Sequence, residues 1–124
     1  MAAKRIMVVD DERDYTQILH RMLERSGYEI VEIWHSPDVF RRLMNESFDL
    51  VILDHAMLEL QGDRICEMIR SEEKLKDLPL IVVTAYRNIQ EDSFKALGAQ
   101  EVVYKPVDRE ELLEKVERCL KRRD

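Results

Sequence analysis

The 124-residue chain is long enough for one compact domain, and its 45% apolar composition can build a hydrophobic core. Lys and Arg number 20 and Asp and Glu number 26, so the net charge is −6, which argues against the broad basic surface of a nucleic-acid-binding protein. The first apolar run covers only Ile6 to Val9, too short for a signal peptide or a membrane span. Cys66 and Cys119 lie far apart and outside any metal-binding pattern, so we expect reduced thiols and a cytoplasmic location.

Short aliphatic runs alternate along the chain with longer segments of helical periodicity. The pattern predicts strands over Arg5–Val9, Tyr28–Ile33, Leu50–Leu53, Leu80–Val83 and Val102–Tyr104. The third and fourth runs are continuously apolar, as expected for parallel strands that helices cover on both faces.

A helix is predicted after each strand, because apolar residues recur there at intervals of three and four. The predicted inward faces consist of Tyr15, Ile18, Leu19, Met22 and Leu23; Val39, Phe40, Leu43 and Met44; Ile65, Met68 and Ile69; Phe94 and Leu97; and Leu112, Leu113, Val116 and Leu120. Gly27 and Gly98 are predicted to end the first and fourth helices. Ser36 is predicted to cap the second helix ahead of Pro37, and Asp108 to cap the fifth.

Five strands, each followed by a helix, predict an α/β fold. The expected architecture is a (βα)5 doubly wound, five-stranded parallel sheet with right-handed crossovers and helices on both faces. No repeat or linker interrupts the pattern, so one domain is predicted over residues 1–124. In such sheets the working site lies at the carboxyl ends of the strands.

Four of the five predicted strands end in a polar or charged side chain. Asp10, Asp11 and Glu12 follow the first strand, Asp54 the third, Thr84 the fourth, and Lys105 with Pro106 the fifth. Neighbouring parallel strands lie only about 5 Å apart, so these groups are expected to converge on one pocket if the four strands are neighbours. Carboxylates this close repel each other, and their hard oxygens suit Mg²⁺, which we expect as the bound ion.

This set of groups is suited to phosphoryl transfer. Asp54, the lone acid after a buried strand, is the expected nucleophile and would form an acyl phosphate, while Asp10 and Asp11 are better placed to hold metal. Lys105 and Thr84 can hold the phosphoryl oxygens, over which the developing charge is spread. Taken one at a time, each residue is an ordinary helix cap, turn or loop residue. Their joint occurrence at the same strand ends favours a site.

The same residues carry a resemblance to a known family. The motifs are Val8-Val9-Asp10-Asp11-Glu12, Asp54 after Leu50-Val51-Ile52-Leu53, Thr84-Ala85, and Gly98-Ala99 ahead of Lys105-Pro106. In this order and spacing they resemble the receiver domains of two-component response regulators, from Lys4 to about Leu120. The resemblance implies the flavodoxin-like strand order 2-1-3-4-5 and a role in phosphorelay signal transduction.

The resemblance also implies roles for single residues. Asp54 would receive a phosphoryl group from a phosphohistidine on a sensor histidine kinase or phosphotransfer protein. Lys105, after a cis bond to Pro106, would pair with the phosphoryl oxygens, and Thr84 would move to hydrogen-bond one of them. Asp11 would ligate Mg²⁺ directly and Asp10 through water. The full metal set would be Asp10, Asp11, Asp54 and the backbone carbonyl of Ala56.

Phosphorylation would make the domain a switch rather than a turnover enzyme, acting by shifting a two-state equilibrium. A downstream target or output domain would read the face of the fourth helix, fifth strand and fifth helix, at Arg87 to Leu97, Val102 to Tyr104 and Asp108 to Lys121. No direct contact with nucleic acid or membrane is expected. A phosphorylation-dependent dimer, and the choice between a stand-alone receiver and part of a longer regulator or hybrid kinase, are left open.

Positions around the expected site depart from the family pattern or stand out beside it. The switch aromatic, usually three residues before the lysine, is replaced by Val102, so Thr84 and the loop after it would carry the signal without an aromatic flip. Ala56 and Tyr86 are expected to lengthen the lifetime of the acyl phosphate, because Ala56 cannot position an attacking water and Tyr86 can shield the site. His55 is expected to turn its side chain away along the chain.

Three other interpretations differ from the receiver interpretation in the motifs that they require. A Mg²⁺-dependent phosphatase or phosphotransferase with an aspartyl nucleophile would show D-x-D on the first strand, and Asp10-Asp11 lacks that spacing. A flavodoxin-like or nucleotide-binding module would show a glycine-rich phosphate loop after the first strand, where this chain has acids. An interaction module that keeps only the fold would be free to lose the acids, Thr84 and Lys105.

Overall fold

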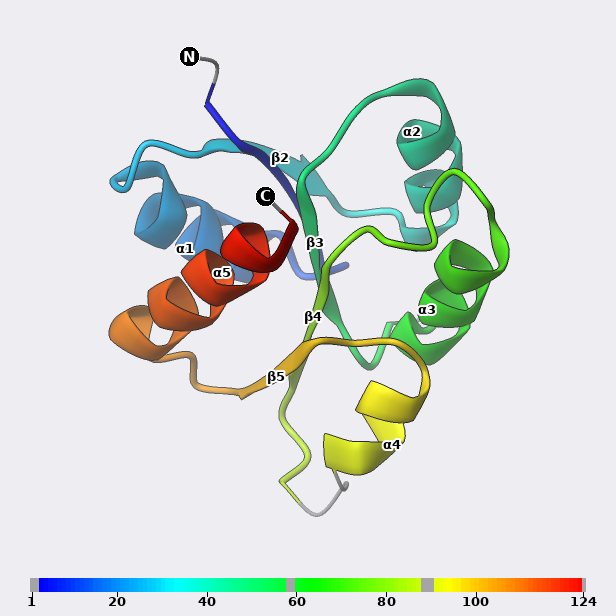
Figure 1. Cartoon of the computed structure of the whole chain (residues 1–124). Helices are drawn as coiled ribbons and strands as arrows, with labels where there is room; N and C mark the ends of the chain where they lie inside the picture. The colour runs from blue at the N-terminus through cyan, green and yellow to red at the C-terminus, as the bar shows by residue number, and fades with distance from the viewer. Residues whose placement is uncertain (1–2, 58–59, 88–90, 124) are drawn as a thin grey trace.

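The computed structural model describes residues 3–57, 60–87 and 91–123, in which strands and helices alternate (Figure 1). The strands are β1 Arg5–Val9, β2 Glu29–Ile33, β3 Leu50–Asp54, β4 Leu80–Thr84 and β5 Glu101–Tyr104. The helices are α1 Arg13–Glu24, α2 Val39–Asn45, α3 Gly62–Ser71, α4 Glu91–Ala96 and α5 Arg109–Arg123, with a 3-10 turn, η1 Ser36–Asp38, ahead of α2. The predicted (βα)5 alternation is confirmed.

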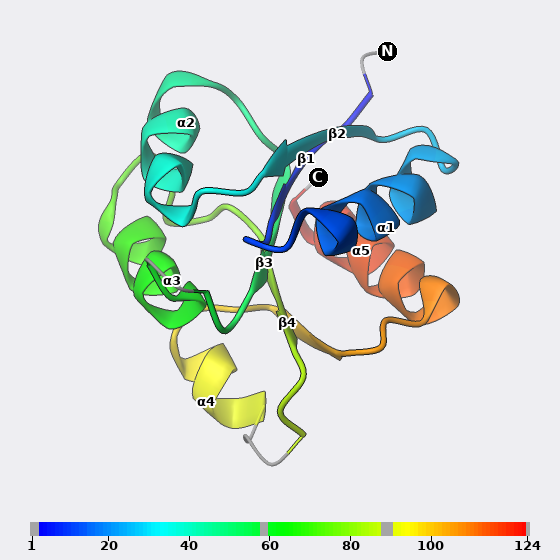
Figure 2. The same ribbon diagram turned by 180° about the vertical axis from the view of Figure 1, so that it is seen from behind.

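All five strands are parallel and lie in the order β2-β1-β3-β4-β5. Helices α1 and α5 cover one face of the sheet, and α2, α3 and α4 cover the other (Figures 1 and 2). The chain adds β2 on one side of β1 and β3 on the other, so the switch point of the sheet lies between β1 and β3, where sheets of this type carry their ligand sites. The flavodoxin-like doubly wound order implied by the resemblance is confirmed.

The core is divided by the sheet into two layers. On one side, Val51 and Leu53 belong to the layer under α2, α3 and α4; on the other, Leu50 and Ile52 belong to the layer under α1 and α5. Every residue of β3 and β4 is buried, which explains why their sequences are continuously apolar rather than alternating. The strand that carries Asp54 is thus held rigidly on both faces.

Two local predictions are wrong. Ile18 is 42% exposed, and Thr16 takes a fully buried place on α1 with Leu19 and Leu23. Ser36 does not cap α2 with its side chain; its hydroxyl accepts a hydrogen bond of 2.9 Å from the backbone N–H of Leu60, in the loop after β3. A buried hydroxyl takes whichever donor tertiary packing brings to it, and helical spacing alone cannot name that donor.

Three predicted helix signals agree with the structure. Asp108 caps α5, since its Oδ2 accepts the N–H of Glu111 at 3.0 Å. Gly27 and Gly98 have φ of +91° and +104° beyond the ends of α1 and α4, a conformation that glycine adopts without strain. Within the described residues, no helix has the length and apolar character to cross a membrane.

Candidate functional site

The polar residues predicted at the strand ends lie at one edge of the sheet. Asp54 is the last residue of β3 and Thr84 the last of β4, while Asp10 follows β1 directly. The backbone N–H of Lys105, just beyond β5, donates to the carbonyl of Thr84 at 2.8 Å, and this bond extends the β4–β5 pairing. The peptide bond between Lys105 and Pro106 is cis, as the resemblance implied.

Three carboxylates and one ammonium form an acidic pocket at this edge. Oxygens of Asp10, Asp11 and Asp54 all lie within 4.8 Å of one another. The Lys105 Nζ lies 3.2 Å from Asp10 Oδ2 and 3.1 Å from Asp54 Oδ1. Asp10 is 2% exposed and Asp54 7%, so water screens their repulsion poorly. The Lys105 ammonium thus pairs with two of these clustered carboxyl groups, Asp10 and Asp54.

The burial and close approach of these groups shift the pKa values of Asp54, Asp10 and Lys105. Burial, and then the charge of Asp10, raise the pKa of Asp54 to about 6, although Lys105 acts in the opposite direction. Burial also raises the pKa of Asp10, against the hydrogen bond from the backbone N–H of Glu12 at 2.9 Å. Burial lowers the pKa of Lys105, but the hydrogen bond and charge of Asp54 outweigh it and the pKa lies above its usual value. A second cation would be favoured in this pocket.

Tyr15 is a site residue that the sequence reasoning treated only as part of the core. The Lys105 Nζ lies 4.1 Å from the centre of the Tyr15 ring, and the Tyr15 hydroxyl accepts the N–H of Val107 at 3.2 Å. The ring thus holds the lysine from the α1 side and anchors the loop beyond Pro106. Its position in the first turn of the helix that follows Asp10 is the signal that could have identified it.

The loop after β3 packs closely against the start of α3. The backbone N–H of Gly62 donates to the carbonyl of His55 at 3.0 Å. A Cβ on Gly62 would lie 2.5 Å from the backbone oxygen of Asp54, so only glycine fits there. Ala56, whose backbone carbonyl is the predicted metal ligand, lies in this loop between His55 and Gly62 and is exposed.

Thr84 is fully buried, and its hydroxyl faces a set of groups that includes His55. The Thr84 Oγ1 accepts the N–H of Tyr86 at 3.1 Å and lies 3.5 Å from the Nδ1 of His55. The His55 ring meets Phe94 edge-on, with centroids 4.9 Å apart. The expectation that His55 turns away from the site is therefore wrong. Its side chain lies between β4 and α4, a contact that sequence spacing cannot reveal.

The two residues near the usual switch-aromatic position differ in burial. Val102 is 1% exposed and belongs to the core under α2, α3 and α4. Tyr104 is half-buried, and the guanidinium of Arg87 lies 5.1 Å from its ring centre. A buried aliphatic side chain, that of Val102, thus occupies the position at which related receiver domains usually carry the switch aromatic.

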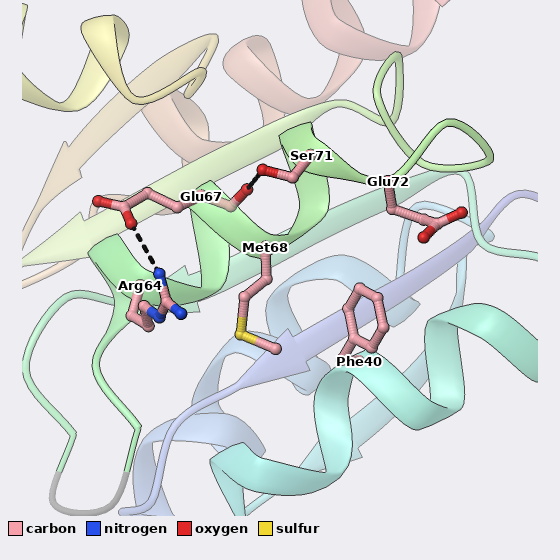
Figure 3. Close-up of a pocket in the computed structure, with 6 residues that line it drawn as sticks. All are labelled: Phe40, Arg64, Glu67, Met68, Ser71 and Glu72. Atoms are coloured by element: carbon pink, nitrogen blue, oxygen red, sulfur yellow. Dashed lines mark hydrogen bonds and ion pairs between the residues drawn. The ribbon is translucent and has the colours of Figure 1, made fainter.

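A separate hollow of about 310 Å³ lies between α2 and α3 (Figure 3). It is lined by Phe40, Arg64, Glu67, Met68, Ser71 and Glu72, none of which belongs to the acidic pocket. Three of its polar residues are already paired with one another, since Arg64 contacts Glu67 at 3.1 Å and the Ser71 hydroxyl donates to the Glu67 carbonyl at 2.8 Å. The acidic pocket is the better candidate for chemistry.

A doubly wound parallel sheet with carboxylates and a lysine at its carboxyl edge is the arrangement of a receiver-type signalling domain. Comparison of this chain with known proteins supports the same class. The family model of the response regulator receiver domain matches residues 6–117. The chain is 29% identical to the alkaline phosphatase synthesis transcriptional regulatory protein PhoP of Bacillus subtilis, over 96% of this chain and 49% of PhoP.

Two solved structures are similar over nearly their whole length. The response regulator TrrA of Thermotoga maritima, in complex with Mg²⁺-BeF, is 35% identical with a TM-score of 0.85, over 94% of this chain and 99% of that one. A response regulator of Chloroflexus aurantiacus has a TM-score of 0.92 at 23% identity, over 97% of this chain and 99% of that one, and this likeness shows the fold alone.

The chain belongs to the response regulator receiver domain family. It is a receiver domain of the kind found in two-component response regulators, and its acidic pocket fits a phosphoacceptor site. Receiver domains are signalling switches rather than classical enzymes. The chain spans about half the length of the transcriptional regulators it matches.

Proposed function

We propose that this chain is a switch that accepts a phosphoryl group on Asp54 from the phosphohistidine of a sensor histidine kinase or phosphotransfer protein. The observation that carries the proposal is the position of the Asp54 carboxylate, 7% exposed, beside two further carboxyl groups and 3.1 Å from the Lys105 ammonium. A nucleophile, a cation and a hydroxyl at one sheet edge are the groups that phosphoryl transfer to a carboxylate needs.

In the proposed reaction an Asp54 oxygen attacks the phosphorus while the bond from phosphorus to the donor imidazole breaks. A new P–O bond replaces the P–N bond, and the imidazole takes up a proton as it leaves. Lys105, already 3.1 Å from the nucleophile, balances the charge of the phosphoryl oxygens. Thr84 supplies a hydroxyl that can donate to one of them. Asp54 must be ionised to attack, and with a pKa of about 6 it is mainly ionised at neutral pH.

The residues of the pocket fit Mg²⁺. Three hard carboxyl groups lie within 4.8 Å of one another, and a divalent cation among them would relieve their repulsion. Asp10, Asp11, Asp54 and the backbone carbonyl of Ala56 are the proposed ligands. When bound, the ion would neutralise charge on the phosphoryl oxygens.

We also propose how the switch is used. Residues 1–124 form a single receiver domain with its core over about 4–120, and turnover of free substrates is not its task.

The partner surface is the face of α4, β5 and α5, although residues 88–90 of the predicted region lie outside the described residues. Ala56 and Tyr86, exposed beside the site, favour a long-lived acyl phosphate. The buried thiols of Cys66 and Cys119 suit a cytoplasmic location.

The test is the intact mass of the protein after incubation with acetyl phosphate and Mg²⁺, beside an Asp54→Asn variant and an EDTA control. We expect one added group of roughly 80 Da that requires both Asp54 and the metal. No adduct under any condition, even with a phosphorylated kinase as donor, would contradict the proposal and favour a fold-only interaction module. Sustained hydrolysis of p-nitrophenyl phosphate would favour the phosphatase alternative.

A further inference from the structure

His55 lies where the acidic pocket meets α4. It follows Asp54 directly, its Nδ1 lies 3.5 Å from Thr84 Oγ1, and its ring packs edge-on against Phe94 at 4.9 Å. A third ring, that of Tyr86, meets it edge-on at 6.0 Å. One half-buried side chain thus contacts the hydroxyl at the end of β4, the loop after it, and the following helix.

The Thr84 hydroxyl has one hydrogen to donate, and this limits what it can contact at one time. The N–H of Tyr86 already fills one acceptor position of Oγ1 at 3.1 Å. The Nδ1 of His55 lies 3.5 Å from Thr84 Oγ1, and in the tautomer that carries its hydrogen on Nε2 it can accept the hydroxyl hydrogen. Phosphoryl oxygens on Asp54 would be acceptors only, so donation to one of them requires Thr84 to give up His55.

Phe94 connects this contact to the surface. Among the six residues of α4 it is the buried one, 3% exposed, while the other five face solvent. The His55 ring lies against its edge at an interplanar angle of 79°. A shift of the His55 ring would therefore displace Phe94, the side chain through which α4 packs on the sheet. Val102, small and fully packed, offers no comparable ring beside Thr84.

We propose that His55 is a positioning residue, which holds the Thr84 hydroxyl in the unphosphorylated protein and passes its release to α4 through Phe94. This inference rests on the proposed function, because the release is driven by an acceptor on Asp54. His55 takes the place that the missing switch aromatic would otherwise have in coupling the site to the surface. It does not contact the reacting atoms.

Two variants separate the two contacts of the ring. His55→Phe keeps the ring against Phe94 but removes the acceptor for Thr84, whereas His55→Asn keeps a polar group near the Nδ1 position and removes the ring. With acetyl phosphate, we expect His55→Phe to be phosphorylated about two- to tenfold faster than wild type, the range that one net hydrogen bond supports, and His55→Asn at the wild-type rate.

The coupling to α4 is measured by hydrogen–deuterium exchange over 91–97 with and without Mg²⁺ and beryllofluoride as the phosphoryl mimic. We expect the mimic to change exchange in wild type and to have less than half that effect in both variants. A wild-type phosphorylation rate in His55→Phe, together with an unchanged α4 response in both variants, would overturn the proposal.

A third measurement does not depend on phosphorylation. The nitrogen NMR shifts of the His55 ring should identify Nδ1 as the unprotonated, hydrogen-bonded atom in wild type, and this signature should be lost in Thr84→Val. Identical ring shifts in the two proteins would overturn the inference about His55 whatever Asp54 does. Failure of the proposed function would instead appear as the absence of an adduct on wild type.

Discussion

The two ends of the sheet both carry ionic clusters, but the clusters have opposite properties. At the amino end, the Arg5 guanidinium donates to the Ser47 carbonyl at 2.8 Å and pairs with Glu29 and Glu46. Arg42 also pairs with Glu46, so two cations serve the same carboxylate. At the carboxyl end, three carboxyl groups lie within 4.8 Å of one another, and the Lys105 ammonium pairs with two of them, Asp10 and Asp54.

The pKa values of the acids follow this difference. Hydrogen bonds from Arg42 and Arg5 lower the pKa of Glu46 to about 2, whereas burial and the charge of Asp10 raise that of Asp54 to about 6. The amino end is satisfied as it stands and serves stability. At the carboxyl end, buried carboxyl groups lie close together and one of them has a raised pKa, a state that favours a bound cation and a reactive carboxylate. We therefore expect substitutions at the two ends of the sheet to have different effects.

Replacing Lys105 by methionine should abolish most of the reactivity of the acidic pocket. The variant removes an ammonium that contacts both Asp54 and Asp10, so phosphorylation by acetyl phosphate should be about 100-fold slower or more. The exposed Lys121, in the last turn of α5, provides the matched control, and Lys121→Met should react like wild type. The measurement is the rate of adduct formation by intact mass. Equal rates for the two variants would contradict the assigned role.

Gly62→Ala should damage the carboxyl end through packing rather than charge. The added Cβ would lie 2.5 Å from the Asp54 backbone oxygen and 2.8 Å from Leu53 Cδ1, so the loop or β3 must move. We expect a loss of about 1–3 kcal/mol in the free energy of unfolding, measured by urea denaturation, with slower phosphorylation. Gly27→Ala is the control: it meets no atom within 4 Å and strains only a positive φ, for a loss of about 1 kcal/mol and unchanged phosphorylation. If Gly62→Ala were as stable and as reactive as wild type, the loop would accommodate the added Cβ without cost and the prediction would be wrong.

Asp54→Asn should make the protein more stable at neutral and alkaline pH when no metal is present. The folded-state pKa of about 6 lies above the ordinary value of 3.8, so the native state retains a proton that the unfolded chain has lost. Stability due to this group is therefore lost as pH rises from about 4 to about 6. In EDTA we expect Asp54→Asn to exceed wild type by about 2 kcal/mol at pH 8, with the difference vanishing near pH 4. A variant less stable than wild type at pH 8 would reverse the inferred sign.

Glu46→Gln should show the opposite pH dependence with a smaller effect. Its folded-state pKa of about 2 lies below the ordinary value of 4.5, so its contribution is present above about 4.5 and is lost as pH falls through about 2. Wild type should thus be more stable than Glu46→Gln at pH 7, and the two should converge in strong acid. Phosphorylation should be unaffected. Parallel stability curves over the whole pH range would remove the contrast between the two ends.

The sequence by itself determined the fold and the polar strand ends. Uninterrupted aliphatic runs such as Leu50–Leu53 are typical of strands covered on both faces, and βα alternation leaves few topologies. Asp54, Thr84 and Lys105 could be placed at one edge because parallel strands all end on the same side of a sheet. These inferences depend on regular patterns in the sequence and not on the details of side-chain packing.

Tertiary structure decided which side chains meet. Helical spacing gave the inward face of α1 only approximately: Ile18, predicted to face inward, is 42% exposed, and Thr16, which the apolar spacing does not include, is buried. The contact of Thr84 with His55 spans 29 residues, and that of Val107 with Tyr15 spans 92. Neither has a local signature, because a buried polar atom bonds to whichever group the folded chain brings within about 3 Å of it, and that is a property of the whole packing.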